Sequence, residues 1–181
     1  MRIIAGKFRS RRLAAPGSLK LRPTSDQLRE TLFNIIGPSI EGSLFIDVFA
    51  GTGAVGIEAL SRGAREVIFI EKHRATAALI RKNLEAFESE AEICEGGALR
   101  ELKQLVSRGV IADFIFADPP YADVDSLRAV LDFVAEREIL ASGGIVIAEH
   151  AARTKMPDAA GTLRRTRELK QRDAVLSFYR R

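Results

Sequence analysis

The chain has 181 residues, of which 46% are hydrophobic and 29% are charged, and this composition is typical of one globular domain with a substantial core. Its single cysteine excludes an internal disulfide and favours the reducing cytoplasm, and its two histidines have no Cys/His cluster that would indicate a metal site. No apolar run of eighteen residues is present and the first residues lack the apolar core of a signal peptide, so we expect no membrane association.

The net charge of +4 is unevenly distributed. Residues 1–40 contain eight Lys/Arg and two Asp/Glu (+6), residues 41–149 contain eleven and nineteen (−8), and residues 150–181 contain nine and three (+6). Two basic ends therefore flank an acidic middle, a segregation that favours binding of a polyanion such as a nucleic acid. The alternative is a pair of solvated ends that are basic without a function.

The first 40 residues are predicted to form a basic extension made of a hairpin and a helix. Residues 1–22 contain seven basic side chains and no acid, and Gly6 and Pro16-Gly17 are turn signals that indicate short strands or a hairpin. Thr24, with Gln27 three residues later, matches a capping box at the start of a helix. The helix would have one apolar face and end at Gly37-Pro38; the face consists of Leu28, Leu32, Ile35 and Ile36.

From residue 41 to residue 181 we expect a second unit of α/β class. Apolar runs near 44–49, 66–71, 91–95, 113–117 and 143–149 are predicted strands with helices between them. Such alternation indicates right-handed crossovers and a parallel sheet covered on both faces. The runs 162–169 and 174–179 have no helix-length gap between them and are predicted to form a hairpin that ends the sheet. Cys94 lies in the third run and is interpreted as a packed strand residue, not a catalytic thiol.

Four of the predicted strands end on an acid: Asp47, Glu71, Asp118 and Glu149. If the strands are parallel, these side chains lie along one carboxyl edge, which is where open α/β sheets bind ligands. For Glu149 two interpretations stay open, a residue of the site wall or a partner for a nearby arginine.

A glycine-rich loop follows the first of these strands. Gly51, Gly53 and Gly56 have the G-x-G-x-x-G spacing of a nucleotide-binding turn, which also fits a dinucleotide-dependent oxidoreductase. Glu71, 20 positions after Gly51, can accept both hydroxyls of a ribose. Asp47 places a negative charge near the loop, which is unfavourable beside a pyrophosphate but suits the ammonium of an amino-acid-bearing nucleoside. S-adenosylmethionine, which has no phosphate, is such a ligand.

The fourth strand runs into Asp118-Pro119-Pro120-Tyr121. The two prolines have no N–H and hold an extended backbone whose carbonyls can accept hydrogen bonds. With the Asp118 carboxylate and the flat face of Tyr121, they suit a planar base that carries an exocyclic amine. A strand end closed by a Pro-Pro turn is the alternative interpretation.

With both motifs the chain resembles the class I S-adenosylmethionine-dependent methyltransferases that act on exocyclic amines. Residues 1–13 and 21–35 resemble the amino-terminal signature of the ribosomal RNA small subunit methyltransferase D family. The resemblance implies a Rossmann-like, mostly parallel sheet with an antiparallel last strand. It also implies methylation of N2 of a guanine in 16S ribosomal RNA, naked or within a small subunit, by a monomer that uses S-adenosylmethionine and no metal.

The predicted site has three groups of residues. The catalytic group is Asp118, Pro119, Pro120 and Tyr121. The cofactor group is Asp47, Phe49, Gly51, Thr52, Gly53, Glu71, Lys72, Gly97 and Ala98. The RNA-binding group is Arg2, Lys7, Arg9, Arg11, Arg12 and Arg22. Gly97 departs from the family pattern, which has an acid or amide there, so backbone groups at Gly97 and Ala98 are expected to contact the adenine.

Three rival functions remain. A DNA adenine methyltransferase shares the motif chemistry but usually needs a target-recognition insertion, and no predicted loop is long enough. A protein-glutamine methyltransferase would favour Asn in place of Asp118 and a helical amino-terminal domain. A catalytically silent RNA-binding module belongs to a different class, and the presence of Asp118, Gly51 and Glu71 argues against it.

Overall fold

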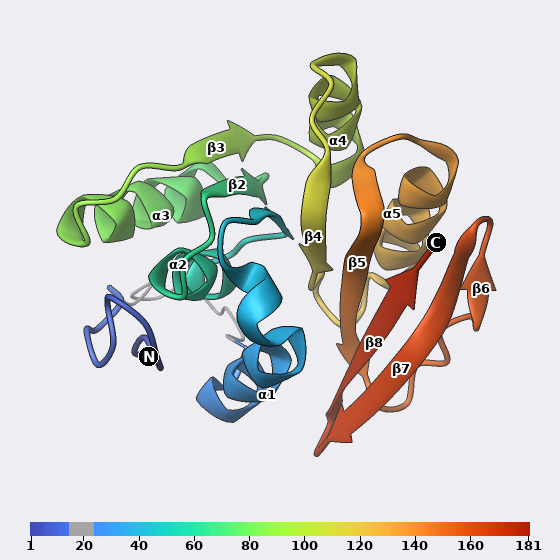
Figure 1. The fold of residues 1–181 in the computed structure, drawn as a ribbon, viewed down its shortest axis with the longest axis horizontal. Helices are drawn as coiled ribbons and strands as arrows, with labels where there is room; N and C mark the ends of the chain where they lie inside the picture. The colour runs from blue at the N-terminus through green and yellow to red at the C-terminus, as the bar shows by residue number, and fades with distance from the viewer. Residues whose placement is uncertain (15–23) are drawn as a thin grey trace.

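The computed structural model describes residues 1–14 and 24–181, which form an α/β fold around an eight-stranded sheet (Figure 1). Arg22 and the Pro16-Gly17 turn predicted from the sequence lie outside the described residues. The helices are α1 (Asp26–Ile36), the 3-10 helix η1 (Gly37–Ile40), α2 (Ala54–Ser61), α3 (Arg74–Ala86), α4 (Ala98–Ser107) and α5 (Val124–Glu136). The strands are β1 (Leu44–Val48), β2 (Glu66–Glu71), β3 (Glu92–Glu95), β4 (Ala112–Ala117), β5 (Leu140–Ala151), β6 (Ala159–Ala160), β7 (Leu163–Gln171) and β8 (Ala174–Arg180).

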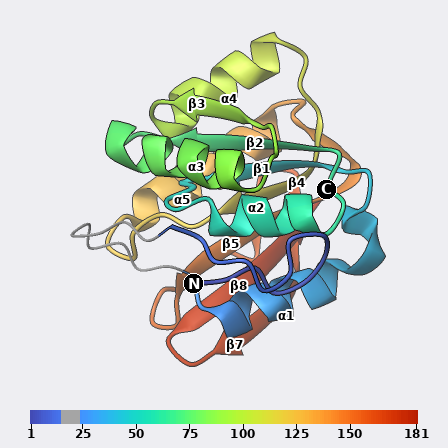
Figure 2. The same cartoon turned by 90° about the vertical axis from the view of Figure 1, so that its left-hand side faces the viewer.

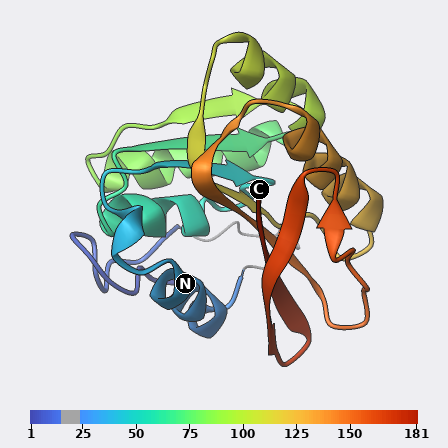
Figure 3. The ribbon, with the colours of Figure 1, turned by 45° about the vertical axis from the view of Figure 1, so that its right-hand side comes forward.

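The strand order is β3-β2-β1-β4-β5-β8-β7-β6. Strands β1 to β5 pair in parallel, whereas β8 pairs antiparallel with both β5 and β7. The expected parallel sheet with an antiparallel last strand is therefore confirmed. The β7–β8 hairpin and β6 lie at the end of the sheet far from α3 (Figure 3). Strand β5 is longer than predicted because its first residue, Leu140, pairs with Ala112 ahead of a register shift.

Two apolar clusters cover the two faces of the sheet. Phe45, Phe69 and Phe116 belong to a cluster that includes residues of α1, α2 and α3. Ile46, Ile68 and Ile115 belong to the cluster with α4 and α5. Figure 1 shows α4 and α5 on the opposite side of the sheet from α1 and α2. Because side chains alternate along a strand, the uninterrupted apolar runs in the sequence are those of strands buried on both faces.

Residues 1–14, called the N-terminal arm below, form a hairpin-like turn that contains one antiparallel bridge, between Arg2 and Arg12. The sequence predicted short strands or a hairpin for residues 1–22, of which residues 15–22 lie outside the described part of the chain. The arm lies between α2 and α1 (Figure 2), and its apolar side chains, Ile3, Phe8 and Leu13, enter the same core as the sheet. Gly6 permits the close approach to α2, since a Cβ there would lie 1.8 Å from the Ser61 carbonyl oxygen.

Helix α1 begins one residue later than the capping-box pattern predicted. Its N-cap is Ser25, whose side chain accepts a hydrogen bond from the Leu28 N–H at 3.1 Å, so the assignment of Thr24 as the cap is wrong. Ser and Thr are both good caps, and local sequence does not decide between adjacent candidates. Gly37 ends the helix as predicted, with a φ of 62°.

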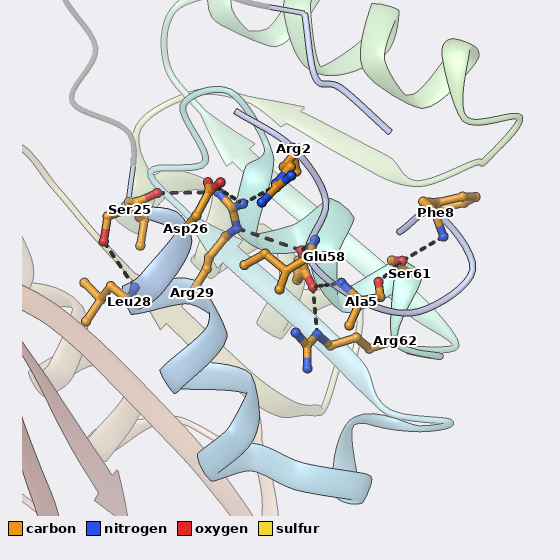
Figure 4. Close-up of polar contacts among 12 residues, drawn as sticks. Arg2, Ala5, Phe8, Ser25, Asp26, Leu28, Arg29, Glu58, Ser61 and Arg62 are labelled. Carbon is orange, nitrogen blue, oxygen red and sulfur yellow. Dashed lines mark hydrogen bonds and ion pairs between the residues drawn. The ribbon is translucent and has the colours of Figure 1, made fainter. Parts of the chain in front are cut away.

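A buried polar cluster fixes the arm and α1 onto α2 (Figure 4). The Glu58 carboxylate on α2 accepts hydrogen bonds from the N–H groups of Ile4 at 2.8 Å and Ala5 at 3.0 Å. It also forms an ion pair with Arg29 of α1, and both side chains are fully buried. Burial lowers the pKa of Arg29, partly offset by Asp26 and Glu58. Removing one partner of such a pair leaves a buried charge uncompensated, so the cluster holds the N-terminal region in one position.

Among the helices that the structure describes, none is long and apolar enough to span a bilayer.

Candidate active site

A cavity of about 360 Å3 opens at the carboxyl edge of β1, β2, β4 and β5. Its wall contains most of the predicted site: Asp47, Phe49, Gly51, Thr52, Glu71, Lys72, Ala98, Asp118, Pro119, Pro120 and Tyr121. Of the predicted cofactor residues, Gly53 and Gly97 are absent from this wall. The sequence did not indicate several other lining residues: Thr24, Ala50, Ala54, Val55, Ile70, His73, Gly96 and Phe116.

The four strand-end acids project from the same face of the sheet. Each follows by two positions a residue of the core cluster against α1 to α3, namely Phe45, Phe69, Phe116 and Ile147. Because side chains alternate with period two, Asp47, Glu71, Asp118 and Glu149 share that face. All four line the cavity.

The glycines of the loop have separate structural roles. Gly51 adopts a positive φ of 54° at the cavity, a conformation that favours glycine. Gly53, with a φ of 75°, is the N-cap of α2. A Cβ on Gly56 would lie 2.2 Å from the Phe69 ring, so this glycine allows α2 to pack closely on β2. Phe49 also has a positive φ, 66°, and a strained non-glycine residue of this kind is a common feature of binding sites.

Asp47 is only 2% exposed, and its carboxylate accepts a hydrogen bond from the Gly56 N–H at 2.9 Å. Burial raises the pKa of Asp47 to about 8; the Glu71 charge also raises it, and the Gly56 hydrogen bond lowers it. A cation placed beside this carboxylate would favour its charged form. The site is therefore suited to a positively charged group.

Glu71 is buried at the end of β2 and organises the loops around it. One carboxylate oxygen accepts the Gly51 N–H at 2.9 Å and the other accepts the His73 N–H at 2.7 Å. A carboxylate has about four acceptor positions, so each oxygen can also accept a hydroxyl. A ribose is such a partner.

The segment between β3 and α4 closes the cavity beyond Glu71. Gly96 and Ala98 line it, whereas Gly97 is the N-cap of α4, where a Cβ would meet nothing within 4 Å. Cys94, on the neighbouring strand, is half-buried against the cluster with α4 and α5. Burial raises the pKa of its thiol to about 12, so it is protonated at neutral pH.

The Asp118-Pro119-Pro120-Tyr121 segment leaves β4 at the centre of the cavity edge. The Pro120 carbonyl accepts the Asp123 N–H at 2.7 Å in a turn. No described residue donates a hydrogen bond to the Pro119 carbonyl. The Thr24 hydroxyl lies 3.3 Å from Asp118 Oδ2 and 3.2 Å from Glu149 Oε2, so the N-terminal region completes this end of the site.

The predicted RNA-binding residues do not form one uniform group. All five described members, Arg2, Lys7, Arg9, Arg11 and Arg12, are exposed on the N-terminal arm, but Arg11 makes additional contacts. The Arg11 guanidinium donates a hydrogen bond to the Ala86 carbonyl, and it lies over the rings of Phe8 and Phe87. Arg11 therefore attaches the arm to α3 in addition to its charge.

No group of three or more His, Cys, Asp and Glu side chains in the described part of the chain is arranged to hold a metal ion.

Comparison with known proteins gives a family. The model of the family "Conserved hypothetical protein 95" matches residues 1–180. "Putative rRNA methyltransferase YlbH" of Bacillus subtilis is 36% identical over 170 residues, which are 93% of this chain and 92% of the relative. Ribosomal RNA small subunit methyltransferase D of Escherichia coli K12 is 35% identical over 87% of this chain and 78% of its own length. The solved structure "Putative methyltransferase yhhF from Escherichia coli" superimposes with a TM-score of 0.86 at 32% identity, over 100% of this chain and 97% of the other.

Proposed function

We propose, from the premise that this chain belongs to the ribosomal RNA small subunit methyltransferase D family, that it transfers a methyl group from S-adenosylmethionine to N2 of a guanine in 16S ribosomal RNA. The observation that carries the proposal is that Glu71 and Gly51, which suit a nucleoside, and Asp118 and Pro119, which suit an amine, line the same cavity. We further propose that the protein acts as a monomer in the cytoplasm, on rRNA alone or within the small subunit.

The chemistry of the cavity fits the proposed cofactor. Asp47 would face the ammonium, Glu71 would accept the ribose hydroxyls, and the loop with Phe49, Gly51, Thr52 and Gly53 would surround the methionine part. Lys72 and the backbone at Gly97 and Ala98 would border the adenine. When bound, S-adenosylmethionine supplies a methyl group on a positively charged sulfur that is an excellent leaving group.

Asp118 and Pro119 would have to orient a poor nucleophile. The lone pair of the guanine amine is delocalised into the ring, and hydrogen bonds from its two N–H groups to Asp118 and the Pro119 carbonyl favour a tetrahedral nitrogen. Asp118 then accepts the proton that the amine loses, as a general base. Most of the rate enhancement in such a site comes from alignment of the reacting groups.

The rest of the site selects how the RNA enters. Stacking of the base on Tyr121 is worth roughly 1–3 kcal/mol in comparable single-strand sites. A base within a helix cannot reach Asp118, so the target nucleotide is flipped out or already unpaired. The exposed basic residues of the N-terminal arm would contact phosphates, which gives affinity and register without base choice.

The test is methyl transfer from labelled cofactor to 16S rRNA, naked and in small subunits, followed by nucleoside analysis. We expect N2-methylguanosine from the wild type and no product from Asp118→Ala, with cofactor binding within several-fold of wild type. Asp125→Ala, an exposed acid in the first turn of α5, is the matched control. Retention of most turnover by Asp118→Ala would refute the role of Asp118, and methylated adenine would refute the choice of base.

A further inference from the structure

The turn between β7 and β8 lies at the same edge of the sheet as the cavity. Strand β8 is antiparallel to both β5 and β7, so β7 runs in the direction of β5 and ends at the carboxyl edge. Ala174, the first residue of β8, pairs with Ala151, the last residue of β5. The turn consists of Arg172 and Asp173, and Figure 1 shows it projecting past the end of β5.

Three exposed basic side chains lie at this turn: Arg153, Lys170 and Arg172. Arg153 belongs to the segment after β5, which is attached to the turn because the Ala152 N–H donates to the Asp173 carbonyl at 2.9 Å. Lys170 is near the end of β7, and Arg172 is in the turn itself. The three residues are called the hairpin patch below. Asp173 is also exposed, and the patch with this one acid keeps a net positive charge.

The cations of the hairpin patch are not used to hold the fold. Within the described part of the chain, none of the three forms an ion pair. Arg165, also on β7, differs because it pairs with Asp158 and Glu168. Charged residues on an edge strand discourage pairing with another sheet, which accounts for Lys170. Arg153 and Arg172 lie outside the strands, so this explanation does not cover them.

Arg172 occupies a position that favours glycine. It is the first residue of a two-residue hairpin turn and has a φ of 56°. Hairpins of this length place glycine or asparagine where φ is positive, because a longer side chain is unfavourable there. Non-glycine residues in such conformations are concentrated at functional sites. Formation of the hairpin alone therefore does not explain an arginine at this position.

The hairpin patch and the N-terminal arm lie on opposite sides of the cavity. Arg11 attaches the arm to α3, which packs against β2 and β3. The cavity opens at the ends of β1, β2, β4 and β5, and β8 and β7 follow β5 in the strand order. One basic surface thus stands beyond each side of an opening lined by acids.

We propose that the hairpin patch is a second phosphate-binding surface, which holds the ribosomal RNA strand on the side of the target nucleotide opposite to the N-terminal arm. A nucleotide turned into the cavity leaves phosphates on both of its sides at the cavity mouth. Arginine and lysine side chains bind such phosphates and fix the register of the strand. This inference rests on the proposed function, since it takes an RNA strand as the partner.

Arg172→Gly tests the proposal, because it removes the cation and supplies the residue that the turn favours. The dissociation constant for naked 16S rRNA is measured over a series of salt concentrations, together with the melting temperature. We expect weaker binding and a dependence of log affinity on log salt that is flatter by roughly 0.7–0.9. The melting temperature should equal or exceed that of wild type, because glycine relieves the positive φ. Arg172→Lys keeps the charge and should keep the wild-type salt slope.

Two controls separate charge and turn geometry from RNA contact. Lys103→Ala removes one exposed cation from α4 and should leave the salt slope unchanged. Glu88→Gly relieves another positive φ, of 50°, and should not weaken RNA binding. Adding Arg153→Ala and Lys170→Ala to Arg172→Gly should flatten the slope further, by roughly 0.7–0.9 for each lost contact. In methylation assays this triple variant should raise KM and leave kcat unchanged, because the patch does not touch the reacting groups.

Two results would overturn the proposal. The first is a triple variant with the wild-type salt slope, or with a change no larger than that of Lys103→Ala, which would reduce the patch to a contribution to net charge. The second is a triple variant whose kcat falls while its RNA affinity stays at the wild-type value, which would give the turn a structural role. Failure of the proposed function is distinguishable, because wild type would then form no N2-methylguanosine in RNA that it still binds.

Discussion

Replacing Asp47 by Asn should make the cofactor-free protein more stable at neutral pH while weakening cofactor binding. The carboxylate is buried and its pKa is raised to about 8 from a usual value of 3.8, mainly by burial. The folded state therefore binds a proton more readily than the unfolded state throughout this pH window. Stability is lost as the pH rises from about 4 to about 8, because the unfolded chain ionises freely and the folded chain does not.

The magnitude follows from the size of the shift. Each pH unit inside the window costs the folded state about 1.4 kcal/mol, so at pH 7 the cost is about 4 kcal/mol relative to a group that never ionises. Asn can still accept the Gly56 N–H, but its buried amide NH2 adds a cost of about 1–3 kcal/mol if unsatisfied. The free energy of unfolding of Asp47→Asn, minus that of wild type, should increase by nearly 3 kcal/mol between pH 5 and pH 7.

Urea unfolding at pH 5, 6 and 7 measures this difference directly, with Asp132→Asn, an exposed acid on α5, as a control for loss of one negative charge. The difference between two proteins removes the pH dependence of all shared groups. A difference that stays constant across the three pH values would refute the argument that burial opposes ionisation of Asp47.

Cofactor binding gives the second half of the test. An ammonium beside Asp47 favours the charged carboxylate, so S-adenosylmethionine should stabilise wild type more than Asp47→Asn in thermal unfolding. NAD should change neither melting temperature. Equal stabilisation of the two proteins by S-adenosylmethionine would show that Asp47 does not interact with the ammonium of the cofactor.

Three other predictions concern the rest of the site. Glu71→Ala should weaken binding of S-adenosylmethionine by about 1.5–3 kcal/mol in calorimetry, through loss of a charge-assisted ribose contact. Glu95, at the end of the adjacent strand β3, does not line the cavity, so the control Glu95→Ala should not weaken cofactor binding. Equal losses of cofactor affinity in the two variants would contradict the ribose role of Glu71. Gly97→Asp supplies the acid that the family pattern has there, at an N-cap with open space, and should raise both cofactor affinity and, by a few tenths of a kcal/mol, the free energy of unfolding. Lower affinity would argue against an adenine contact at this position. Arg9→Ala with Arg12→Ala should flatten the dependence of log RNA affinity on log salt by roughly 0.7–0.9 per lost phosphate contact, with an unchanged melting temperature. Arg11 is not changed because it attaches the arm to Phe87. An unchanged salt slope would show that Arg9 and Arg12 do not contact phosphates, and the basic strand β7 would then be the better candidate.

The sheet and its acidic edge could be predicted because their signals are local. Each apolar run between two turn signals became a strand at nearly the expected bounds. The acids could be located because a parallel sheet brings the carboxyl ends of its strands to one edge. The common face of the acids follows from the period of two, since each stands two positions after an apolar core residue.

The roles of individual basic residues were not predictable in the same way. Arg29 belongs by sequence to the basic extension, yet it is fully buried because Glu58, 29 positions later, pairs with it. Arg11 is exposed as predicted, but it also lies over the Phe87 ring and donates to the Ala86 carbonyl, which attaches it to α3. In each case the partner is remote in the sequence, and a count of charges contains no information about it.

Thr24 is the site residue whose role depends most on partners that are remote in the sequence. As a helix cap it would satisfy the backbone N–H groups of α1, and Ser25 does so instead. Because Ser25 caps the helix, the Thr24 hydroxyl can instead contact the carboxyl groups of Asp118 and Glu149, which lie 94 and 125 positions later in the sequence. Ser25 thus caps α1, and Thr24 completes the cavity wall. The ion pair between Arg29 and Glu58 holds α1, at whose start both residues lie. The N-terminal extension consequently supplies part of the cavity wall, at the end where we propose that the base binds, in addition to its exposed basic residues.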